Sequence, residues 1–300
     1  MTLSEAELDR YSRQLLMDEW GGTAQQRLRG ARAIVVGAGA LGSPVAHYLA
    51  AAGVGQLGIV DGDEVELSNL HRQPLHFTPD IGAPKAETAA AKLTLLNPEI
   101  VVEPYPATLS ALNAEAILMG ADVVVDCTDS FESRYVVNDA CCALGIDLVE
   151  AGVVAFEGLV LSIRPGVSAC YRCAFPEPPP AATRRSCREA GVLGAMAGIV
   201  GSIQALEALK LLSGVGEPLL DRILQLDGHG MGQTLITTAR REGCPACDRP
   251  AGGREGGAAG GASGAVAAAG PGAADARTGA VAGAGPGEAG GARDQGAAAR

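Results

Sequence analysis

The feature that most constrains this chain is a glycine-rich turn that separates an apolar run from a helical pattern. Residues 34–42 read IVVGAGALG, which is a strand-like run followed by a G-x-G-x-x-G pattern. A strand, turn and helix in this order present free backbone N–H groups and the positive end of a helix dipole, which together bind phosphate. The next apolar run ends at Asp61, whose carboxylate suits ribose hydroxyls. We therefore predict a nucleotide site with Gly37, Gly39 and Ala40 in the phosphate-binding turn.

Strand-like and helix-like patterns alternate along the first half of the chain. We expect strands within 34–36, 56–60, 100–107, 121–130 and 145–152, and helices at 4–17, 84–96 and 132–144. The first of these helices opens with a capping-box pattern, Ser4 followed by Glu7. Strands that alternate with helices form a parallel, doubly wound sheet.

The alternation stops after residue 152, where shorter strand patterns surround one long apolar helix. These strands are expected at 157–165, 222–228 and 232–238, and the helix at 193–212. We therefore predict an α/β fold with a doubly wound, Rossmann-like, mostly parallel sheet and an antiparallel C-terminal extension. Gln204, Glu207 and Lys210 interrupt the apolar run 192–212, which favours a buried helix over a membrane span.

The composition changes sharply near residue 250. Residues 251–300 are mostly glycine and alanine and contain no aromatic side chain, so we expect a folded domain at 1–250 and a disordered tail at 251–300. Acidic and basic side chains balance within that tail, so the net charge of −11 belongs to the domain and argues against nucleic acid as a partner. No secretory pattern opens the chain, which favours a reducing cytoplasm for its eight cysteines.

Polar side chains gather directly after the second strand and favour ATP over NAD as the nucleotide. The stretch DGDEVELSNLHRQ, residues 61–73, brings Asn69, Arg72 and Gln73 close behind Asp61, and Lys85 follows in GAPKAE. Two cations and an amide beside a phosphate-binding turn suit a triphosphate, whose charge must be neutralised. The alternatives are that the two cations are solvated surface charges, and that the turn binds NAD.

Two acidic residues follow the fourth strand in DCTDS, residues 126–130. Ligands of open parallel sheets bind beyond the carboxyl ends of the strands, so a carboxylate there can hold a magnesium ion that bridges phosphates. The alternative role is helix capping, by Asp129 or by Ser130. We favour metal binding for Asp129, and both roles stay open for Asp126.

Taken in order, these stretches resemble one family of enzymes. RYSRQ (10–14), GAGALG (37–42), DGDEVELSNLHRQ (61–73), GAPK (82–85), DCTDS (126–130) and CREAGVLG (187–194) are similar to the ThiF/MoeB/HesA family of adenylating enzymes, bacterial relatives of ubiquitin-activating enzymes. The resemblance spans residues 4–248. It implies that ATP and Mg²⁺ are used to adenylate the C-terminal glycine of a small ubiquitin-like sulfur-carrier protein, with release of pyrophosphate.

The resemblance also implies roles for single residues. Asp61 would bind ribose, and Asn69, Arg72 and Lys85 would bind the phosphates. Asp129 would hold magnesium, and Arg13 would reach into the site of a second subunit, which makes a homodimer part of the mechanism. The full nucleotide set comprises Gly37, Gly39, Ala40, Asp61, Asp63, Ser68, Asn69, Arg72, Gln73, Lys85, Asp129 and Ser130. The chain departs from the family at Ala40, where Gly is frequent, and at Ser130, where Asn is frequent.

The cysteines predict two kinds of chemistry. Cys170 and Cys173 form one C-x-x-C pair, and Cys244 and Cys247 form another, so that four thiolates can hold a structural Zn²⁺. A redox pair is the alternative. Cys187 has arginines on both sides, which favour its thiolate, and in related enzymes a cysteine here can form a thioester or persulfide link with the carrier.

Two other functions stay open from the sequence alone. An NAD(P)-dependent oxidoreductase would explain residues 34–61, and a zinc-stabilised binding protein would need no catalysis. The histidines show no spaced pairing, and we assign none of them a role. If the chain is an adenylating enzyme, we expect its sulfur donor to be a separate sulfurtransferase.

Overall fold

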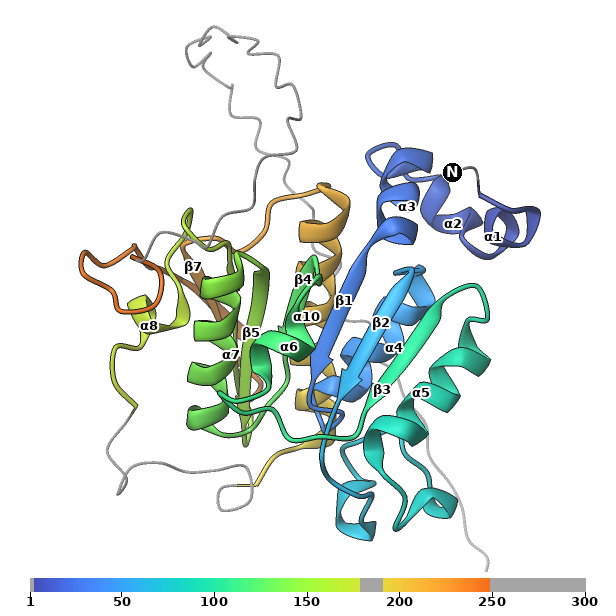
Figure 1. The fold of residues 1–300 in the computed structure, drawn as a ribbon, viewed down its shortest axis with the longest axis horizontal. Coiled ribbons are helices and arrows are strands. Elements are labelled where there is room, and N and C mark those ends of the chain that lie inside the picture. The colour runs from blue at the N-terminus through green and yellow to red at the C-terminus, as the bar shows by residue number, and fades with distance from the viewer. Residues whose placement is uncertain (1–2, 179–190, 249–300) are drawn as a thin grey trace, which may run out of the picture. The chain divides into compact units, whose positions relative to one another are not determined.

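The computed structural model describes residues 3–178 and 191–248, and its centre is one eight-stranded sheet (Figure 1). The strand order is β3-β2-β1-β4-β5-β6-β7-β8, parallel from β3 to β5 and antiparallel from β5 to β8. The strands are β1 (Arg32–Val36), β2 (Gln56–Val60), β3 (Val101–Tyr105), β4 (Val123–Asp126), β5 (Asp147–Val154), β6 (Glu157–Ile163), β7 (Arg222–Asp227) and β8 (Gly232–Thr237). The predicted doubly wound sheet with an antiparallel extension is confirmed.

Helices cover both faces of the parallel strands, and the strand sequences show why. Ala33 and Val35 of β1 belong to one hydrophobic core, whereas Ile34 and Val36 belong to the other, because successive side chains of a strand point to opposite faces. The first core is closed by α3 (Gly21–Gly30), α4 (Gly42–Ala52), α5 (Lys85–Leu96) and α10 (Gly194–Ser213). The second is closed by α6 (Ala114–Leu118), α7 (Phe131–Leu144) and α8 (Tyr171–Ala174).

The N-terminal segment differs from its expected single helix. The capping box at Ser4 and Glu7 is present, but the helix divides into α1 (Glu5–Arg10) and α2 (Ser12–Leu15) at Tyr11. Tyr11 is buried and its hydroxyl accepts a hydrogen bond from Asn97 at the end of α5. The chain therefore turns where the tyrosine enters the core, and the helical pattern does not reveal this tertiary contact.

The long apolar helix α10 is a core helix in this fold. By length and composition alone it could cross a membrane, but it packs against α4, β5 and β6. Gln204 is fully buried and donates from Nε2 to the carbonyls of Asp126 and Val149. The carboxylate of Glu207 accepts hydrogen bonds from Ser162 Oγ and from the backbone N–H of Leu219. Two of the three polar residues that interrupt the apolar run, Gln204 and Glu207, thus bond the helix to strands of the sheet.

Two predictions lie outside the described residues. These are the disordered tail at 251–300 and the reactive Cys187. The chain divides into the units Met1–Glu255 and Gly256–Arg300, and the described residues belong to the first.

Candidate functional site

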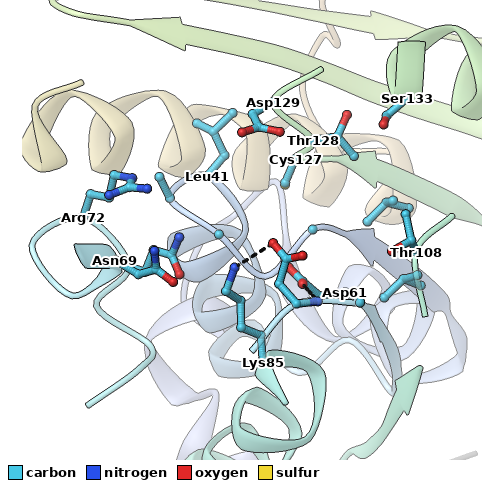
Figure 2. Close-up of a pocket in the computed structure, with 18 of the residues that line it drawn as sticks. Leu41, Asp61, Asn69, Arg72, Lys85, Thr108, Cys127, Thr128, Asp129 and Ser133 are labelled. Atoms are coloured by element: carbon cyan, nitrogen blue, oxygen red, sulfur yellow. Dashed lines mark hydrogen bonds and ion pairs between the residues drawn. The ribbon is translucent and has the colours of Figure 1, made fainter. Parts of the chain in front are cut away.

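A cavity of about 760 Å³ lies at the carboxyl ends of the parallel strands (Figure 2). It is lined by residues of the glycine turn, of the segment 61–73, of α5, and of the loops that follow β3 and β4. Ligands of doubly wound sheets bind at this edge, where the strand order reverses next to β1. Of the predicted nucleotide set, Gly37, Gly39, Ala40, Asp61, Asp63, Ser68, Asn69, Arg72, Gln73, Lys85 and Asp129 line this one cavity.

The glycine turn needs its first and last glycines for different reasons. Gly37 has a φ of +98°, a conformation that L side chains rarely adopt. A Cβ at Gly42 would lie 1.8 Å from the carbonyl oxygen of Gly37, so the start of α4 can approach the turn only without a side chain. The turn then places Gly39 and Ala40 at the cavity just before the N-terminus of α4. A backbone of this shape suits an anion.

Asp61 holds the turn and the following loop together. Its Oδ2 accepts the backbone N–H of Ala38 at 2.8 Å, and its Oδ1 accepts that of Asp63 at 2.8 Å. Each oxygen keeps a second lone pair for a ligand hydroxyl. The carboxylate is thus oriented toward the cavity before any ribose binds.

Lys85 brings a buried positive charge to the cavity. It is the first residue of α5 and is only 6% exposed, and its Nζ lies 3.1 Å from Oδ2 of the exposed Asp63. A buried ammonium needs an anionic partner, and a bound phosphate can share that role with Asp63. This arrangement favours a polyphosphate over the adenosine half of a dinucleotide.

The segment 67–73 carries the remaining polar groups on this side. A short 3₁₀ turn, Leu67–Asn69, buries Asn69, whose Oδ1 accepts the backbone N–H of Glu66. Nη1 of Arg72 donates to the carbonyl of Ser68 at 2.8 Å and lies 2.9 Å from Nε2 of His71, which leaves the N–H groups of Nη2 and Nε for a ligand. Gln73 is buried, and its Oε1 has no partner among the described residues. An unpaired buried oxygen beside the glycine turn indicates a missing ligand.

Metal binding and helix capping were both considered for the side chains of the loop after β4. Ser130 caps α7, because its Oγ accepts the backbone N–H of Ser133 at 3.0 Å, and it is not among the residues that line the cavity. Asp129 therefore does not serve as the cap, and its exposed carboxylate lies at the cavity with Thr128. Asp126 is fully buried and accepts the N–H of Thr128 at 2.9 Å.

Sequence reasoning missed a charged group beside the cavity. Arg134 of α7 lines it, and its Nε lies 3.4 Å from Oε1 of Glu150. Glu150 is fully buried and pairs in register with Asp126 on the neighbouring strand. Burial first, and the nearby Asp126 second, raise the pKa of Glu150 well above its usual value. Neither the spacing nor the charge pattern of the sequence shows that these three residues meet.

Thr108 was also missed, although a signal for it existed. It follows β3 and lines the cavity beside Gly62. The rule that ligands bind beyond the carboxyl ends of strands applies to the third strand as well as to the second and fourth. The loop after residue 105 could therefore have been included.

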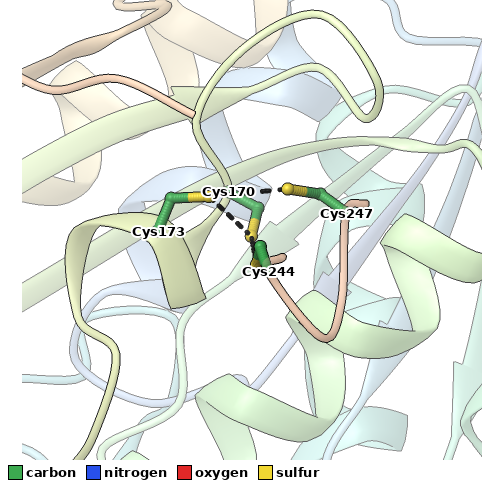
Figure 3. Close-up of side chains that lie close together, drawn as sticks. All are labelled: Cys170, Cys173, Cys244 and Cys247. Atoms are coloured by element: carbon green, nitrogen blue, oxygen red, sulfur yellow. Dashed lines mark hydrogen bonds between the residues drawn. The ribbon is translucent and has the colours of Figure 1, made fainter. Parts of the chain in front are cut away.

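The four predicted zinc ligands lie together (Figure 3), and none of them lines the cavity. Their sulfur atoms all lie within 4.8 Å of one another, and the pairs Cys170–Cys173, Cys170–Cys244 and Cys173–Cys247 are separated by 3.8, 3.6 and 3.5 Å. A tetrahedral Zn²⁺ with Zn–S bonds of about 2.3 Å requires sulfur separations of about 3.8 Å.

The four thiols of this cluster differ in their electrostatics. The pKa values of Cys170, Cys173 and Cys247 are raised, with burial among the main causes. Burial also opposes ionisation of Cys244, but the backbone N–H groups of Cys247 and Ala246, together with the thiols of Cys170 and Cys173, lower the pKa of Cys244 to about 7. A thiol that ionises near neutral pH is a ready ligand, since metals bind the thiolate. The sulfur set therefore fits a structural zinc ion.

Arg13 lies outside this cavity. It is an exposed residue of α2 and is not among the residues that line the cavity. Its expected role in the site of a second subunit stays a prediction. Cys187 lies outside the described residues.

Fold and cavity together define a class of protein: a doubly wound α/β protein with a cavity at the carboxyl edge of its sheet whose lining suits a nucleotide polyphosphate. The match to the ThiF family covers residues 11–246, and the chain belongs to that family.

Relatives and solved structures agree with this membership. The chain is 46% identical to a sulfur carrier protein adenylyltransferase of Thermus thermophilus, over 83% of this chain and 94% of the relative. It is 47% identical to the SAMP-activating enzyme E1 of Haloferax volcanii, over 82% and 91%. The fold is similar to that of E. coli MccB crystallised with ATP, with a TM-score of 0.71 and 23% identity over 81% of this chain and 75% of MccB.

Proposed function

We propose that this chain is an ATP-dependent adenylyltransferase for the C-terminal glycine of a small ubiquitin-like sulfur-carrier protein. The observation that carries the proposal is one cavity that joins a glycine turn, the buried Lys85, Arg72 and the exposed Asp129. Two relatives, which are 46% and 47% identical to this chain, are named for adenylation of a sulfur carrier protein and for activation of SAMP. Among the described residues, the polar and charged groups that line this cavity favour a polyphosphate over a nicotinamide ring.

The reaction needs alignment and charge neutralisation from the protein. A carboxylate oxygen of the carrier attacks the α-phosphorus of ATP, the bond from that phosphorus to the bridging oxygen breaks, and pyrophosphate leaves with its electron pair. Lys85 and Arg72 neutralise the phosphate charge, and the turn at Gly39 offers backbone N–H donors. No general base is required, since the attacking group is already ionised.

Magnesium fits the donors present at the cavity. Asp129 supplies a carboxylate that no helix cap uses, and oxygen donors are what Mg²⁺ prefers. When bound, the ion would neutralise charge on the phosphates. Zn²⁺ would bind the four cysteines and hold the segment after β8 against α8, a structural role because four protein ligands fill its positions.

A homodimer completes the proposal. Exposed apolar side chains lie on two helices that pack together, Tyr48 on α4 and Ile199 and Leu206 on α10. A twofold interface would bury this surface. Arg13 of one subunit would then reach the phosphates of the other. We place the enzyme in the cytoplasm, with Cys187 available to the carrier and a separate sulfurtransferase as sulfur donor.

Pyrophosphate exchange tests the function. The purified chain with ATP, Mg²⁺ and a carrier that ends in Gly-Gly should incorporate labelled pyrophosphate into ATP. The same carrier without its last glycine is the control and should give no exchange. If no carrier supports exchange while NADH binds tightly, the chain is an oxidoreductase instead.

A further inference from the structure

One buried histidine joins two parts of the nucleotide cavity, although the proposed reaction uses no histidine. His76 is 2% exposed, and both of its ring nitrogens have partners. Nε2 lies 2.9 Å from the carbonyl oxygen of Ala38, in the glycine turn. Nδ1 lies 3.0 Å from Oγ1 of Thr88, in the first turn of α5. The ring therefore bridges the turn and the helix that begins with Lys85.

The partners define which nitrogen carries the hydrogen. A carbonyl oxygen can only accept, so Nε2–H of His76 donates to Ala38. Nδ1 contacts the hydroxyl of Thr88, which also lies 3.1 Å from the carbonyl oxygen of Lys85 and donates to it. Burial above all, and the nearby Lys92 and Lys85, lower the pKa of His76, while the hydrogen bond to Ala38 and the charge of Asp61 act in the opposite sense. In the neutral ring Nε2 is thus the donor to Ala38, and Nδ1 is an acceptor that competes with the carbonyl of Lys85 for the hydrogen of the Thr88 hydroxyl.

The bond to Ala38 determines the direction of the next amide. The carbonyl of Ala38 and the N–H of Gly39 belong to one planar trans peptide group, so they point in opposite directions. His76 holds that carbonyl on the buried side of the turn, and the N–H of Gly39 must therefore point away from the ring. Gly39 lines the cavity, and its N–H donates to no atom of the described residues.

A second contact holds the same residue from its other side. The backbone N–H of Ala38 donates to Oδ2 of Asp61 at 2.8 Å. With its N–H held by Asp61 and its carbonyl by His76, Ala38 cannot rotate either of the peptide groups that flank it. Two side chains that follow β2, Asp61 and His76, thus hold the amide of Gly39 in its orientation.

We propose that His76 is a positioning residue for the nucleotide: by holding the carbonyl of Ala38 against α5, it aims the N–H of Gly39 at a phosphate group of ATP. The inference rests on the proposed function, since it assumes that the cavity binds ATP. It assigns to His76 no contact with the nucleotide.

Calorimetric binding of two ligands tests this role. His76→Leu removes the bridge, so affinity for ATP should fall about tenfold to a hundredfold, the loss expected for a misdirected hydrogen bond to a charged group. Affinity for adenosine, which has no phosphate, should stay within about twofold of the wild type, because the bridge acts on the phosphate-facing amide alone. His76→Gln can both donate to Ala38 and accept from Thr88, and it should restore most of the ATP affinity.

Thr88 offers a milder variant in case the leucine variant does not fold. Thr88→Val removes the hydroxyl that pairs with Nδ1 and that also donates to the carbonyl of Lys85, so it should weaken ATP binding roughly fivefold without affecting adenosine. Thr94→Val is the matched control, since Thr94 lies on the same helix and its hydroxyl donates to the carbonyl of Ala90 without contacting His76. This control should bind both ligands like the wild type.

The outcomes separate this inference from the proposed function. If the wild type binds ATP and the variants at 76 and 88 bind it equally well, or lose ATP and adenosine to the same extent, the positioning role is wrong and the function stands. If the wild type binds no ATP, the proposed function fails and this inference fails with it.

Discussion

At the scale of single residues, replacement of Asp129 should greatly reduce catalysis and leave the stability of the fold nearly unchanged. It lies in a loop, its carboxylate is exposed at the cavity, and Ser130 rather than Asp129 caps α7. Asp129→Asn should therefore lower pyrophosphate exchange by about a hundredfold or more, since a charge that stabilises the phosphates is lost. The free energy of unfolding should change by less than about 0.5 kcal/mol.

A matched variant shows whether the loss of exchange is specific to Asp129 or follows from the loss of any exposed carboxylate. Glu115→Gln removes an exposed carboxylate on α6, and this residue does not line the cavity. It should leave exchange and stability unchanged. Full activity of Asp129→Asn would rule out Asp129 as the magnesium ligand.

The buried acid Glu150 should make stability depend on pH. Its pKa is raised, first by burial and then by Asp126, so the folded chain holds a proton that the unfolded chain releases above about pH 4.5. The stability that this proton contributes is fully present below that pH and is lost as pH rises through the raised pKa. Glu150→Gln cannot ionise, so it should be more stable than the wild type at pH 8, by on the order of 1 kcal/mol, and not at pH 5.

Urea unfolding at the two pH values measures this difference. Glu157→Gln, an exposed change on the adjacent strand β6, should show no such pH dependence relative to the wild type. An equal difference between Glu150→Gln and the wild type at both pH values would mean that the buried carboxyl stays ionised.

How much of the site the sequence predicts depends on where each residue lies along the chain. Asp61, Arg72 and Lys85 follow strands or open a helix within short, recognisable stretches, so their meeting at one edge follows from the fold class alone. Arg134 and Glu150 come from the interior of a helix and of a strand, where they resemble solvated charges in the sequence. Only the packing of α7 on the sheet brings their side chains together.

At the scale of elements, the start of α10 should be sensitive to a single added methyl group. A Cβ at Gly194 would lie 2.4 Å from the carbonyl oxygen of His71 and 3.1 Å from Cα of Arg72. Gly194→Ala should push the segment that carries Arg72 and weaken ATP binding about tenfold or more, with a loss of stability of about 1–3 kcal/mol. Calorimetry and thermal unfolding measure the two effects.

The same helix supplies the control for that change. A Cβ at Gly198 would have nothing within 4 Å, so Gly198→Ala should stabilise the chain by about 1 kcal/mol through helix propensity and leave ATP binding intact. If both alanine variants bind ATP equally well, the packing of α10 on the segment at Arg72 does not position that residue.

The four-cysteine cluster should matter more for stability than for nucleotide binding. It ties Cys170 and Cys173, around α8, to Cys244 and Cys247, which follow β8. Removal of zinc by a chelator should lower Tm by more than about 5 °C, because a bound ion that closes this link stabilises the folded state. ATP affinity should change by less than about threefold, since none of the four lines the cavity.

Elemental analysis gives the complementary measurement. The wild type should contain about one zinc per chain, and Cys244→Ser should contain little. Cys141→Ala, a buried cysteine of α7 outside the cluster, should keep its zinc. A zinc content near zero in the wild type would remove the structural assignment.

The elements themselves were predictable to different degrees. The core strands and α5 follow apolar runs with clear breakers, such as Pro84 and the pair Asn97–Pro98, and they form where the sequence indicates. The helix α3 was not predicted, because it is short and its end residues Gly21 and Gly30 are poor helix formers. It forms because Leu28 and Ala24 are buried in the core, which is a tertiary effect.

At the scale of the whole molecule, the proposed homodimer predicts that sites are shared between subunits. Arg13 is exposed and does not line its own cavity, whereas Asp129 does. Arg13→Ala and Asp129→Asn homodimers should each be inactive. A heterodimer of the two variants keeps one intact site, built from Asp129 of one subunit and Arg13 of the other, and should retain about half of wild-type exchange.

Purification through two different affinity tags, one on each subunit, isolates that heterodimer for assay. If Arg13 acted on the cavity of its own chain, every site in the heterodimer would carry one defect and exchange would stay at the level of the homodimers. A chain that sediments as a monomer at the assay concentration would contradict the shared site as well. Restored activity requires both a twofold assembly and a guanidinium that crosses it, and no arrangement within one chain produces that result.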